Sequence, residues 1–560
     1  MADLKQVNLL SLLTESSSGV LVIPDFQRDF VWKLKQIEEL INSIINNYFI
    51  GSILLLESPI QNKRFAPRLI RGVSHTQVNL QEHDTIRYIL DGQQRITSLY
   101  YAFFEPNVTL SDETDFICKF YMHPDTMDIF GLMDPEDMAR RLRLGADAKK
   151  KFYEIYNDIY GVDIKNLPTM SIFRSQQALN EYIDNNPRLT PTFKEKIISL
   201  FTKINACTIP IITLPVNTSD DDIVNIFERI NRTGTPLGIF ELAVARYYPL
   251  GINLNVLKDK IKGSLFLKIL DGESILKAMA LSKDFEPKPQ NLIKLIDTQK
   301  SNSENLAEFY TLWDSAVKYL GKALDRIRHN YGAPEIKVGK RTIDLIPYTS
   351  MIVPMAVMLY EIERHGNSAS LFEKVDLWYW VTVFSQKYTH GVEAKSYNDV
   401  RIIRDWFMNA TSKPDFTCNF EHIRTEMLKS ARSSALGKGF YNLLILNNCR
   451  DLLTGQEIKL SECHVDHIFP SSRFGRAADS IFNLTLLDRN TNQKKKDKLP
   501  DEFITECLES HGNDDNKLMK TLESHFISTK SLEAIRSNNL DAFIQSRADL
   551  FIDKFKAKVI

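Results

Sequence analysis

The chain has 560 residues, more than one compact core usually accommodates, and about three domains are expected from that length. Hydrophobic residues make up 43% of it, a composition that excludes an intrinsically disordered protein. The formal net charge is -1, so no overall positive field attracts nucleic acid. Any contact with DNA must therefore come from a local cluster of basic residues.

The first residues, the apolar runs and the cysteines indicate the compartment. MADLKQVNLLSLL has neither a basic start nor a cleavage site, so it is not a signal peptide. The longest apolar candidate, from Met351 to Tyr360, is too short to span a membrane and contains Pro354. The six cysteines form no CxxC pair, which argues against a disulfide framework or a four-cysteine zinc site, and for Cys463 beside His464 a buried thiol is favoured over a zinc ligand. We expect a soluble, cytoplasmic protein.

Strand-like and helix-like patterns alternate over residues 1–250. Short apolar runs bounded by turn residues predict strands at 51–57, 85–90 and 208–215. The prolines of the last run place it at a sheet edge or lie at strand ends. Helices are expected at 35–46, 96–104 and 220–232.

From about 250 to 430 the pattern is mostly helical, with buried helices expected at 345–363 and 372–386. Nothing in this region demands chemistry, and we interpret it as a helical connector. After about 430 come a short β-like stretch, a cluster of His, Asp and Asn, and a lysine run. The expected organisation is an α+β, multidomain chain with domains at 1–250, 251–430 and 431–560.

The segment Asp91-Gly-Gln-Gln-Arg-Ile-Thr97 lies between the predicted strand 85–90 and the helix that follows. A strand, a glycine turn and a helix start present free backbone N–H groups and the positive end of a helix, which is a natural phosphate site. Gly92 allows close approach of the backbone, and Arg95 has the forked geometry that clamps a phosphate oxygen. The chain has no GxxxxGK[ST] run, so this is not a P-loop.

The other polar side chains of this turn suit hydrolysis of a phosphate chain. Gln93 or Gln94 is able to position a water, and Asp91 is able to bind a metal or orient that water. Taken alone, however, the run is more simply a turn followed by a polar helix start.

A second constellation lies in Cys463-His-Val-Asp-His-Ile-Phe-Pro470 and the residues that follow it. Hydrolysis of a phosphodiester needs a base to activate water and a cation to neutralise the developing charge. Asp466 offers a carboxylate ligand for a hard cation such as Mg²⁺, and His467 offers an imidazole base. Asn492 offers an amide oxygen as a further ligand, and Asn483 is able to fix a loop and orient the imidazole.

This arrangement resembles the HNH, or ββα-metal, nuclease motif, in which a strand carries Asp-His, a loop an Asn, and a helix the last His or Asn. The resemblance implies a catalytic site in which Asp466 and Asn492 are metal ligands, His467 is the general base and Asn483 the orienting residue. His464 has no fixed role in that family and is kept as a secondary candidate of the site. The alternative is a polar loop whose Asp and His only cap and hydrogen-bond, and the two asparagines at motif spacing weigh against it.

A basic run follows Asn492 and contains Lys494, Lys495 and Lys496. Such a run is usually a solvated surface. Directly after a proposed metal ligand it also suits phosphate contacts, which dominate affinity for DNA. The two interpretations weigh about equally.

The amino-terminal half resembles the GmrSD family of modification-dependent (type IV) restriction endonucleases. The resemblance rests on Pro24-x-x-Gln27-Arg28, Trp32, the 91–95 turn and Phe227-Glu-Arg-Ile-Asn-Arg-Thr-Gly-Thr-Pro-Leu237. In that family a domain related to the ParB/sulfiredoxin-like fold precedes an HNH-like domain, the order seen here. The resemblance covers roughly residues 10–250 and 430–500.

Membership implies binding and hydrolysis of a nucleoside triphosphate, GTP, ATP or another, at Asp91–Arg95. It also places Gln27, Arg28 and Asn231 near the nucleotide, whereas Trp32 is favoured as a core residue. The implied substrate is phage DNA that carries base or backbone modifications, such as glucosylated hydroxymethylcytosine.

Together these features predict a nucleotide-regulated endonuclease, dependent on Mg²⁺ or Mn²⁺, that cleaves or nicks phage DNA in antiviral defence. No membrane partner is expected, and a homo-oligomer is left open. One alternative is a nucleotide-binding, DNA-sensing regulator with an inactive HNH fold, but all four HNH site residues are present. The other is an HNH-type RNase toxin, which the sequence does not separate from a DNase.

Overall fold

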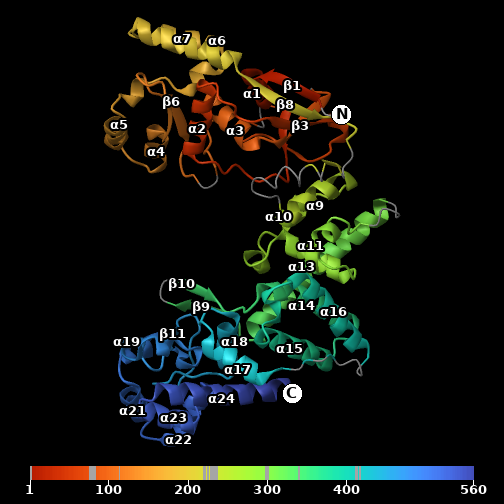
Figure 1. Cartoon of the computed structure of the whole chain (residues 1–560), viewed down its shortest axis with the longest axis vertical. Helices are drawn as coiled ribbons and strands as arrows, with labels where there is room; N and C mark the ends of the chain where they lie inside the picture. Colours follow the sequence, from red (N-terminus) through yellow and green to blue (C-terminus); the bar gives the residue numbers. More distant parts are fainter. Residues whose placement is uncertain are drawn as a thin grey trace. The chain divides into compact units, whose positions relative to one another are not determined.

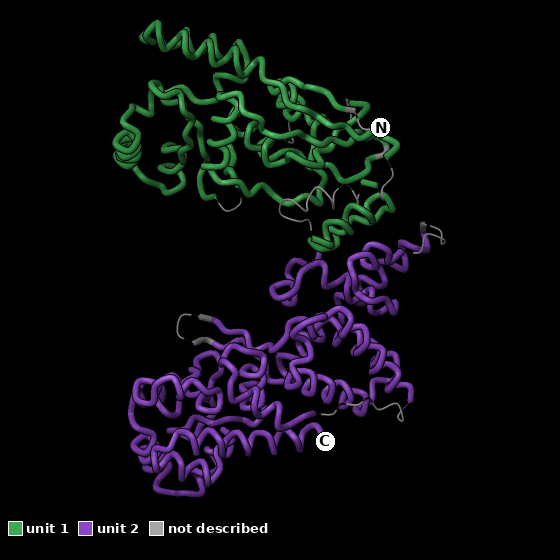
Figure 2. The backbone as a smooth tube through the Cα atoms, viewed as in Figure 1, with its two compact units in different colours: residues 1–259 green, residues 260–560 purple. Residues whose placement is uncertain are grey.

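The computed structural model describes residues 3–74, 78, 83–111, 114–218, 222–223, 226, 238–296, 302–338, 341–409, 414, 416 and 418–560. The chain forms two compact units, Met1–Asp259 and Lys260–Ile560, coloured differently in Figure 2. The division lies close to the boundary expected near residue 250. From residue 260 onward, the predicted helical connector and the predicted nuclease domain belong to one unit.

In the described part of the first unit, one mixed sheet has the strand order β1-β8-β3-β5-β2-β4. Its strands are β1 (Asp3–Asn8), β2 (Leu21–Pro24), β3 (Ile53–Pro59), β4 (Pro67–Arg68), β5 (Thr85–Asp91) and β8 (Thr208–Leu214). The pairs β2–β5 and β3–β8 are parallel, and the other neighbours are antiparallel. The strands predicted at 51–57, 85–90 and 208–215 are therefore confirmed.

The position of β8 corrects one expectation about its prolines. The strand is paired on both sides, with β1 and β3, so an edge position is wrong. Pro215 lies just after the strand, and Pro210 lies inside it, opposite Gln6 of β1. The helix predicted at 220–232 lies almost entirely outside the described residues.

Helices pack against this sheet (Figure 1), and buried apolar side chains of the helices and the sheet form one large core. They are α1 (Leu9–Ser17), α2 (Leu34–Ile45), α3 (Gln93–Phe104), α6 (Gln176–Asn185) and α7 (Pro191–Ala206). In α2 the buried positions are Ile37, Leu40, Ile41 and Ile44, the i, i+3, i+4, i+7 spacing of an amphipathic helix. This spacing is the reason the sequence predicted a helix there, and the helix is confirmed.

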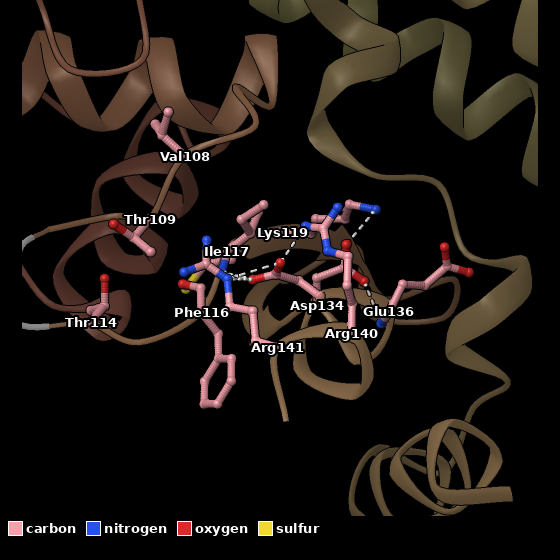
Figure 3. A network of polar contacts seen from close by, with 12 residues as sticks. Val108, Thr109, Thr114, Phe116, Ile117, Lys119, Asp134, Glu136, Arg140 and Arg141 are labelled. Carbon is pink, nitrogen blue, oxygen red and sulfur yellow. Dashed lines mark hydrogen bonds and ion pairs between the residues drawn. The ribbon is translucent and has the colours of Figure 1, made fainter. Parts of the chain in front are cut away.

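A smaller group of elements adjoins the sheet and holds a polar network. It contains the hairpin β6 (Cys118–Met122) and β7 (Ile129–Met133), and the helices α4 (Pro135–Arg141) and α5 (Ala146–Tyr160). Buried Asp137 accepts a hydrogen bond from the backbone N–H of Ile117 at 2.8 Å and pairs with Arg140 and Arg141 (Figure 3). Because the buried Asp137 carboxylate binds the Ile117 backbone and pairs with both arginines of α4, we interpret this network as a structural anchor of the hairpin.

The second unit begins with helices that pack on one another. They are α11 (Gly272–Ser282), α13 (Asn302–His329), α14 (Ile352–Arg364), α15 (Ala369–Phe384) and α16 (Val392–Met408), with a hairpin of β9 (Glu335–Val338) and β10 (Arg341–Asp344). The helices predicted at 345–363 and 372–386 correspond to α14 and α15. Trp378 of α15 is fully buried and donates from Nε1 to Asp399 Oδ2 at 2.8 Å, so its polar atom is satisfied in the core.

The remainder of the unit surrounds a two-stranded sheet of β11 (His464–His467) and β12 (Leu484–Leu487). Its helices are α17 (Phe420–Lys429), α18 (Ala435–Leu446), α19 (Ser471–Phe474), α20 (Arg489–Lys495), α21 (Pro500–Ser510), α22 (Asp515–Ser524), α23 (Thr529–Arg536) and α24 (Leu540–Val559). Further helices of the chain are α9 (Ile239–Tyr247), α10 (Leu254–Lys260) and α12 (Pro289–Leu292).

Helix α24, dark blue in Figure 1, joins this sheet through a buried arginine. Arg547 donates from Nη1 to the carbonyl oxygens of Phe482 and Leu484, at 2.7 and 2.9 Å, and from Nε to that of His525 at 3.0 Å. These bonds pin the start of β12. The fold is thus mixed α+β and multidomain, as predicted. No helix among the described residues is long and apolar enough to cross a membrane.

Candidate functional site

Strand β11, strand β12 and helix α20 bring the predicted residues of the carboxyl-terminal constellation together. Residues 464 and 466 of β11 share one strand face, and α20 contacts this strand. The start of α20 is held by Asp451, whose Oδ1 accepts from Thr491 Oγ1 at 2.7 Å and whose Oδ2 accepts from the Asp488 backbone N–H at 3.0 Å. This anchoring fixes where Asn492 and Lys495 lie.

Asn483 is fully buried and acts on the loop that follows the Asp-His pair. Its Oδ1 accepts from the Phe469 backbone N–H at 2.8 Å, and its Nδ2 donates to the carbonyl oxygens of Phe469 and Ala478, both at 2.9 Å. The predicted loop-fixing role fits these three bonds. The Asn483 carbonyl oxygen also accepts from the backbone N–H of Ile468, the residue after His467, at 2.7 Å.

Asp466 lies between an imidazole and an ammonium group. Its Oδ1 is 3.8 Å from His467 Nδ1, and its Oδ2 is 3.3 Å from Lys495 Nζ. Burial raises the pKa of the Asp466 carboxyl, but His467 and Lys495 outweigh burial and hold that pKa below its usual range. The residue is therefore a carboxylate, the form that binds a cation.

His467 has a second acidic neighbour that sequence reasoning missed. Its Nε2 lies 3.5 Å from Oδ1 of Asp479, a mostly exposed residue in the loop between β11 and Asn483. Both distances are longer than that of an ordinary hydrogen bond, so neither acid forms a close pair with the ring. The motif has no fixed position for an acidic residue in this segment. The sequence alone therefore did not identify Asp479 as a neighbour of His467.

Asn492 presents an amide oxygen without a partner. Its Oδ1 is buried and has no hydrogen bond, and its Nδ2 lies 3.4 Å from His464 Nδ1. Leaving a buried acceptor unsatisfied costs on the order of 1–3 kcal/mol, which a cation ligand would offset. His464, a secondary site candidate from the sequence, thus lies beside the predicted metal ligand.

The ligand types present fit a hard divalent cation. Within the described part of the chain, no group of three or more His, Cys, Asp or Glu side chains is placed to hold a metal ion. The site instead offers the carboxylate of Asp466 and the free amide oxygen of Asn492. Mg²⁺ accepts one or two such protein oxygens and keeps several waters, so these residues suit Mg²⁺ or Mn²⁺.

The structure separates the three lysines that the sequence treated as one DNA-contacting run. Lys494 and Lys496 are exposed, whereas the side chain of Lys495 is only 1% exposed and faces Asp466. Burial lowers the pKa of the Lys495 ammonium in spite of the attraction of Asp466. Lys495 is therefore part of the site rather than of the surface. The sequence feature that could have indicated this role is the i+3 spacing between Asn492 and Lys495, because it puts both residues on one helix face.

The Asp91–Arg95 turn of the first unit has the predicted strand–turn–helix geometry. Gly92 has a φ of 97°, a backbone conformation that residues with a side chain rarely adopt, and glycine is therefore favoured at this turn. Arg95 donates to the Ile50 carbonyl oxygen at 2.7 Å and to Asp91 Oδ2 at 3.1 Å. The guanidinium is thus held beside the turn, with its charge balanced by Asp91.

The Gln27–Arg28 segment lies against this turn. Gln93 Nε2 donates to the Arg28 carbonyl oxygen at 2.9 Å, and Gln94 Nε2 donates to that of Asp29 at 3.2 Å. Gln27 Nε2 donates to the carbonyl oxygen of Ile89 at 2.7 Å, so its amide supports the end of β5.

The remaining predicted residues of this region have distinct positions. The side chain of Arg28 is exposed, and Trp32 is partly buried and packs against the core, in keeping with its predicted role. Asn231 lies outside the described residues. In the second unit Cys463 is buried, and burial raises the pKa of its thiol to about 11, as expected of an inert thiol.

Comparison with known proteins matches two parts of the chain. Residues 9–248 match the GmrSD restriction endonuclease N-terminal domain, and residues 451–501 match an HNH endonuclease domain. The chain is also similar to an uncharacterized protein of Methanocaldococcus jannaschii, with 28% identity over 98% of each chain. The first domain match includes the Asp91–Arg95 turn, and the second includes all of β11, β12 and α20.

Proposed function

From the GmrSD-like architecture of the chain, we propose that it is a nucleotide-regulated, metal-dependent nuclease that cuts modified phage DNA. In this architecture a GmrSD restriction endonuclease N-terminal domain is followed by an HNH endonuclease domain. The two domains support a nuclease of a restriction system. The observation that carries the proposed metal dependence is the pair of oxygens on Asp466 and Asn492, one charged and the other buried without a partner.

The residues around this pair supply the rest of a hydrolytic site. When bound, the cation neutralises charge that builds on the phosphate and the leaving oxygen. His467 accepts the proton of the attacking water, and the carboxylates of Asp466 and Asp479 stabilise the imidazolium that results. Asn483 holds the loop after His467 in place, and exposed Lys494 and Lys496 contact the DNA backbone.

The first unit binds and hydrolyses a nucleoside triphosphate at the Asp91–Arg95 turn. Support comes from the free helix start after Gly92 and from the adjacent guanidinium of Arg95, because both favour phosphate. With a nucleotide bound, Arg95 would hold a phosphate oxygen, and Asp91 would bind a metal or orient a water.

The test is a digestion of modified and unmodified phage DNA and of RNA transcripts by the full chain, with and without Mg²⁺ and each triphosphate. The expected result is metal-dependent cleavage of modified DNA that changes with triphosphate. Cleavage in the presence of a chelator would contradict the metal site. Triphosphate turnover without any cleavage would favour a DNA-sensing regulator, and cleavage of transcripts alone would favour an RNase.

A further inference from the structure

Lys495 brings a fixed positive charge into the site proposed for a divalent cation. Its side chain is 1% exposed, and its Nζ lies 3.3 Å from Asp466 Oδ2, whereas Lys494 and Lys496 on either side are exposed. Withdrawing an ammonium from water is unfavourable unless a partner compensates for the lost hydration. Asp466 is that partner, so the position of Lys495 is a specific one and not a consequence of a basic surface.

The turn between α20 and α21 keeps the side chain of Lys495 buried. The helix ends at Lys495 because Lys496 adopts a φ of 48°, a left-handed conformation rare outside glycine. The chain then turns into α21, whose Phe503 ring lies 5.8 Å from the Lys495 ammonium. Lys498 pairs with Glu506 of the same helix at 2.5 Å and holds this turn closed. Exposure of Lys495 would therefore require undoing the turn.

The contact with Lys495 divides the two oxygens of Asp466 between two tasks. Oδ2 is held by the ammonium, whereas Oδ1 has the longer contact of 3.8 Å with His467 Nδ1 and is the oxygen left for a cation, with the unpartnered Oδ1 of Asn492 as a further ligand. We propose that Lys495 is a positioning residue that fixes the carboxylate of Asp466 as a one-oxygen ligand and balances its charge. This inference rests on the proposed metal-dependent nuclease.

The charge balance has a consequence for metal affinity. With Lys495 present, the pair with Asp466 is neutral before a cation arrives, whereas without the ammonium the carboxylate is uncompensated. A divalent cation is then attracted more strongly, because a positive charge a few ångströms away has been removed. The same ammonium favours the developing negative charge on the phosphate. Its loss is expected to tighten metal binding and slow cleavage, a combination that loss of a merely structural side chain does not produce.

The experiment compares Lys495→Met with Lys494→Met, which removes a cation from the exposed side of the same helix. Binding of Mn²⁺ alone is measured by titration calorimetry in full-length protein that also carries His467→Ala and does not cut. Lys495→Met is expected to bind Mn²⁺ about tenfold more tightly, and Lys494→Met within about twofold of its parent. With His467 restored and metal saturating, Lys495→Met is expected to cut DNA about 10–100-fold more slowly. Unchanged or weaker Mn²⁺ affinity in folded Lys495→Met overturns the proposal.

Lys495→Arg keeps the charge and covers the case in which the methionine variant does not fold. Its Mn²⁺ affinity is expected within about threefold of the parent, and a tenfold gain overturns the role of charge. Measurements on the wild-type protein distinguish failure of the Lys495 proposal from failure of the proposed metal-dependent nuclease. If it binds Mn²⁺ and cuts DNA while Lys495→Met behaves like it in both, only the role of Lys495 fails. If it binds no metal, the proposed function fails as well.

Discussion

The hydroxyl of Thr491 donates to Asp451 Oδ1 at 2.7 Å, and both side chains are buried. Asp451 lies 40 residues earlier in the chain, so the bond ties the start of α20 to a distant segment. The same carboxylate accepts from the Asp488 backbone N–H at 3.0 Å, just before the helix. Asn492 and Lys495 therefore owe their positions to an acid at the first residue of the HNH match, which is not one of the four predicted site residues.

Thr491→Val tests this anchor because it removes one hydrogen bond at nearly constant volume. The free energy of unfolding is expected to fall by about 1 kcal/mol, and the Mn²⁺ affinity is expected to fall with it as α20 shifts. Urea unfolding and titration calorimetry of the full chain provide the two measurements. The matched control is Thr505→Val, whose exposed hydroxyl bonds only to the Asp501 carbonyl oxygen. An equal loss in both variants would remove any special role for Thr491.

His467→Ala removes the proposed general base. DNA cleavage is expected to fall by ~10²–10⁴-fold while folding and DNA binding persist. Cleavage is measured on supercoiled DNA at saturating metal, and binding is measured by fluorescence anisotropy on a labelled duplex. A folded variant that cuts at the wild-type rate would remove the HNH assignment of this residue.

Arg95→Ala removes the guanidinium beside the Asp91–Arg95 turn. Triphosphate turnover is expected to collapse, because the phosphate loses its forked cationic partner. Phosphate release is measured for the full chain, with Arg188→Ala as an exposed arginine control in the same unit. Turnover that survives in both Arg95→Ala and Asp91→Ala would place the nucleotide site elsewhere.

The two activities are expected to be coupled, because a nuclease that cuts at all times would damage its host. A nucleotide shifts an equilibrium between open and closed states only through different affinities for them. Triphosphate affinity is measured in His467→Ala protein with and without a modified duplex, so that the DNA stays intact. The duplex is expected to change that affinity at least severalfold. Identical affinities would mean two independent activities on one chain.

Stability is expected to depend on the protonation of buried His525. Its Nδ1 accepts from Thr485 Oγ1 at 2.6 Å, and its Nε2–H donates to the Arg450 carbonyl oxygen. Burial, with a smaller contribution from Arg547, lowers the pKa of His525 to about 4. The unfolded chain therefore binds the proton more readily below its ordinary pKa of about 6.5.

The sign of the pH effect follows from this difference. His525 contributes its full stability above about pH 6.5 and loses about 3 kcal/mol as the pH falls to about 4. Urea unfolding between pH 4 and pH 8 is expected to show this loss in wild type, with a smaller slope in His525→Gln. Parallel pH profiles for the two proteins would assign the acid sensitivity to other groups.

Local sequence determined the elements and the main members of both candidate sites. The apolar spacing of α2 and the short apolar run of β3 depend on side-chain periodicity alone, so they were readable without tertiary contacts. The Asp466–His467 pair and the two downstream asparagines were readable because a ββα unit is assembled from contiguous chain. The glycine turn at Gly92 was readable for the same reason, since a strand and a helix follow each other directly there.

Only the tertiary structure decided which charges of these sites are buried and which face water. The sequence does not distinguish Lys494, Lys495 and Lys496, which are three consecutive lysines. In the structure only Lys495 lies on the buried side of α20, where it contacts Phe503 and Asp466. The prolines of β8 left open a sheet edge or a position at strand ends, and only the pairing with β1 and β3, from distant parts of the chain, excluded the edge. Burial of a side chain and pairing of a strand depend on contacts between residues far apart in sequence. The periodicity of a single segment does not contain this information.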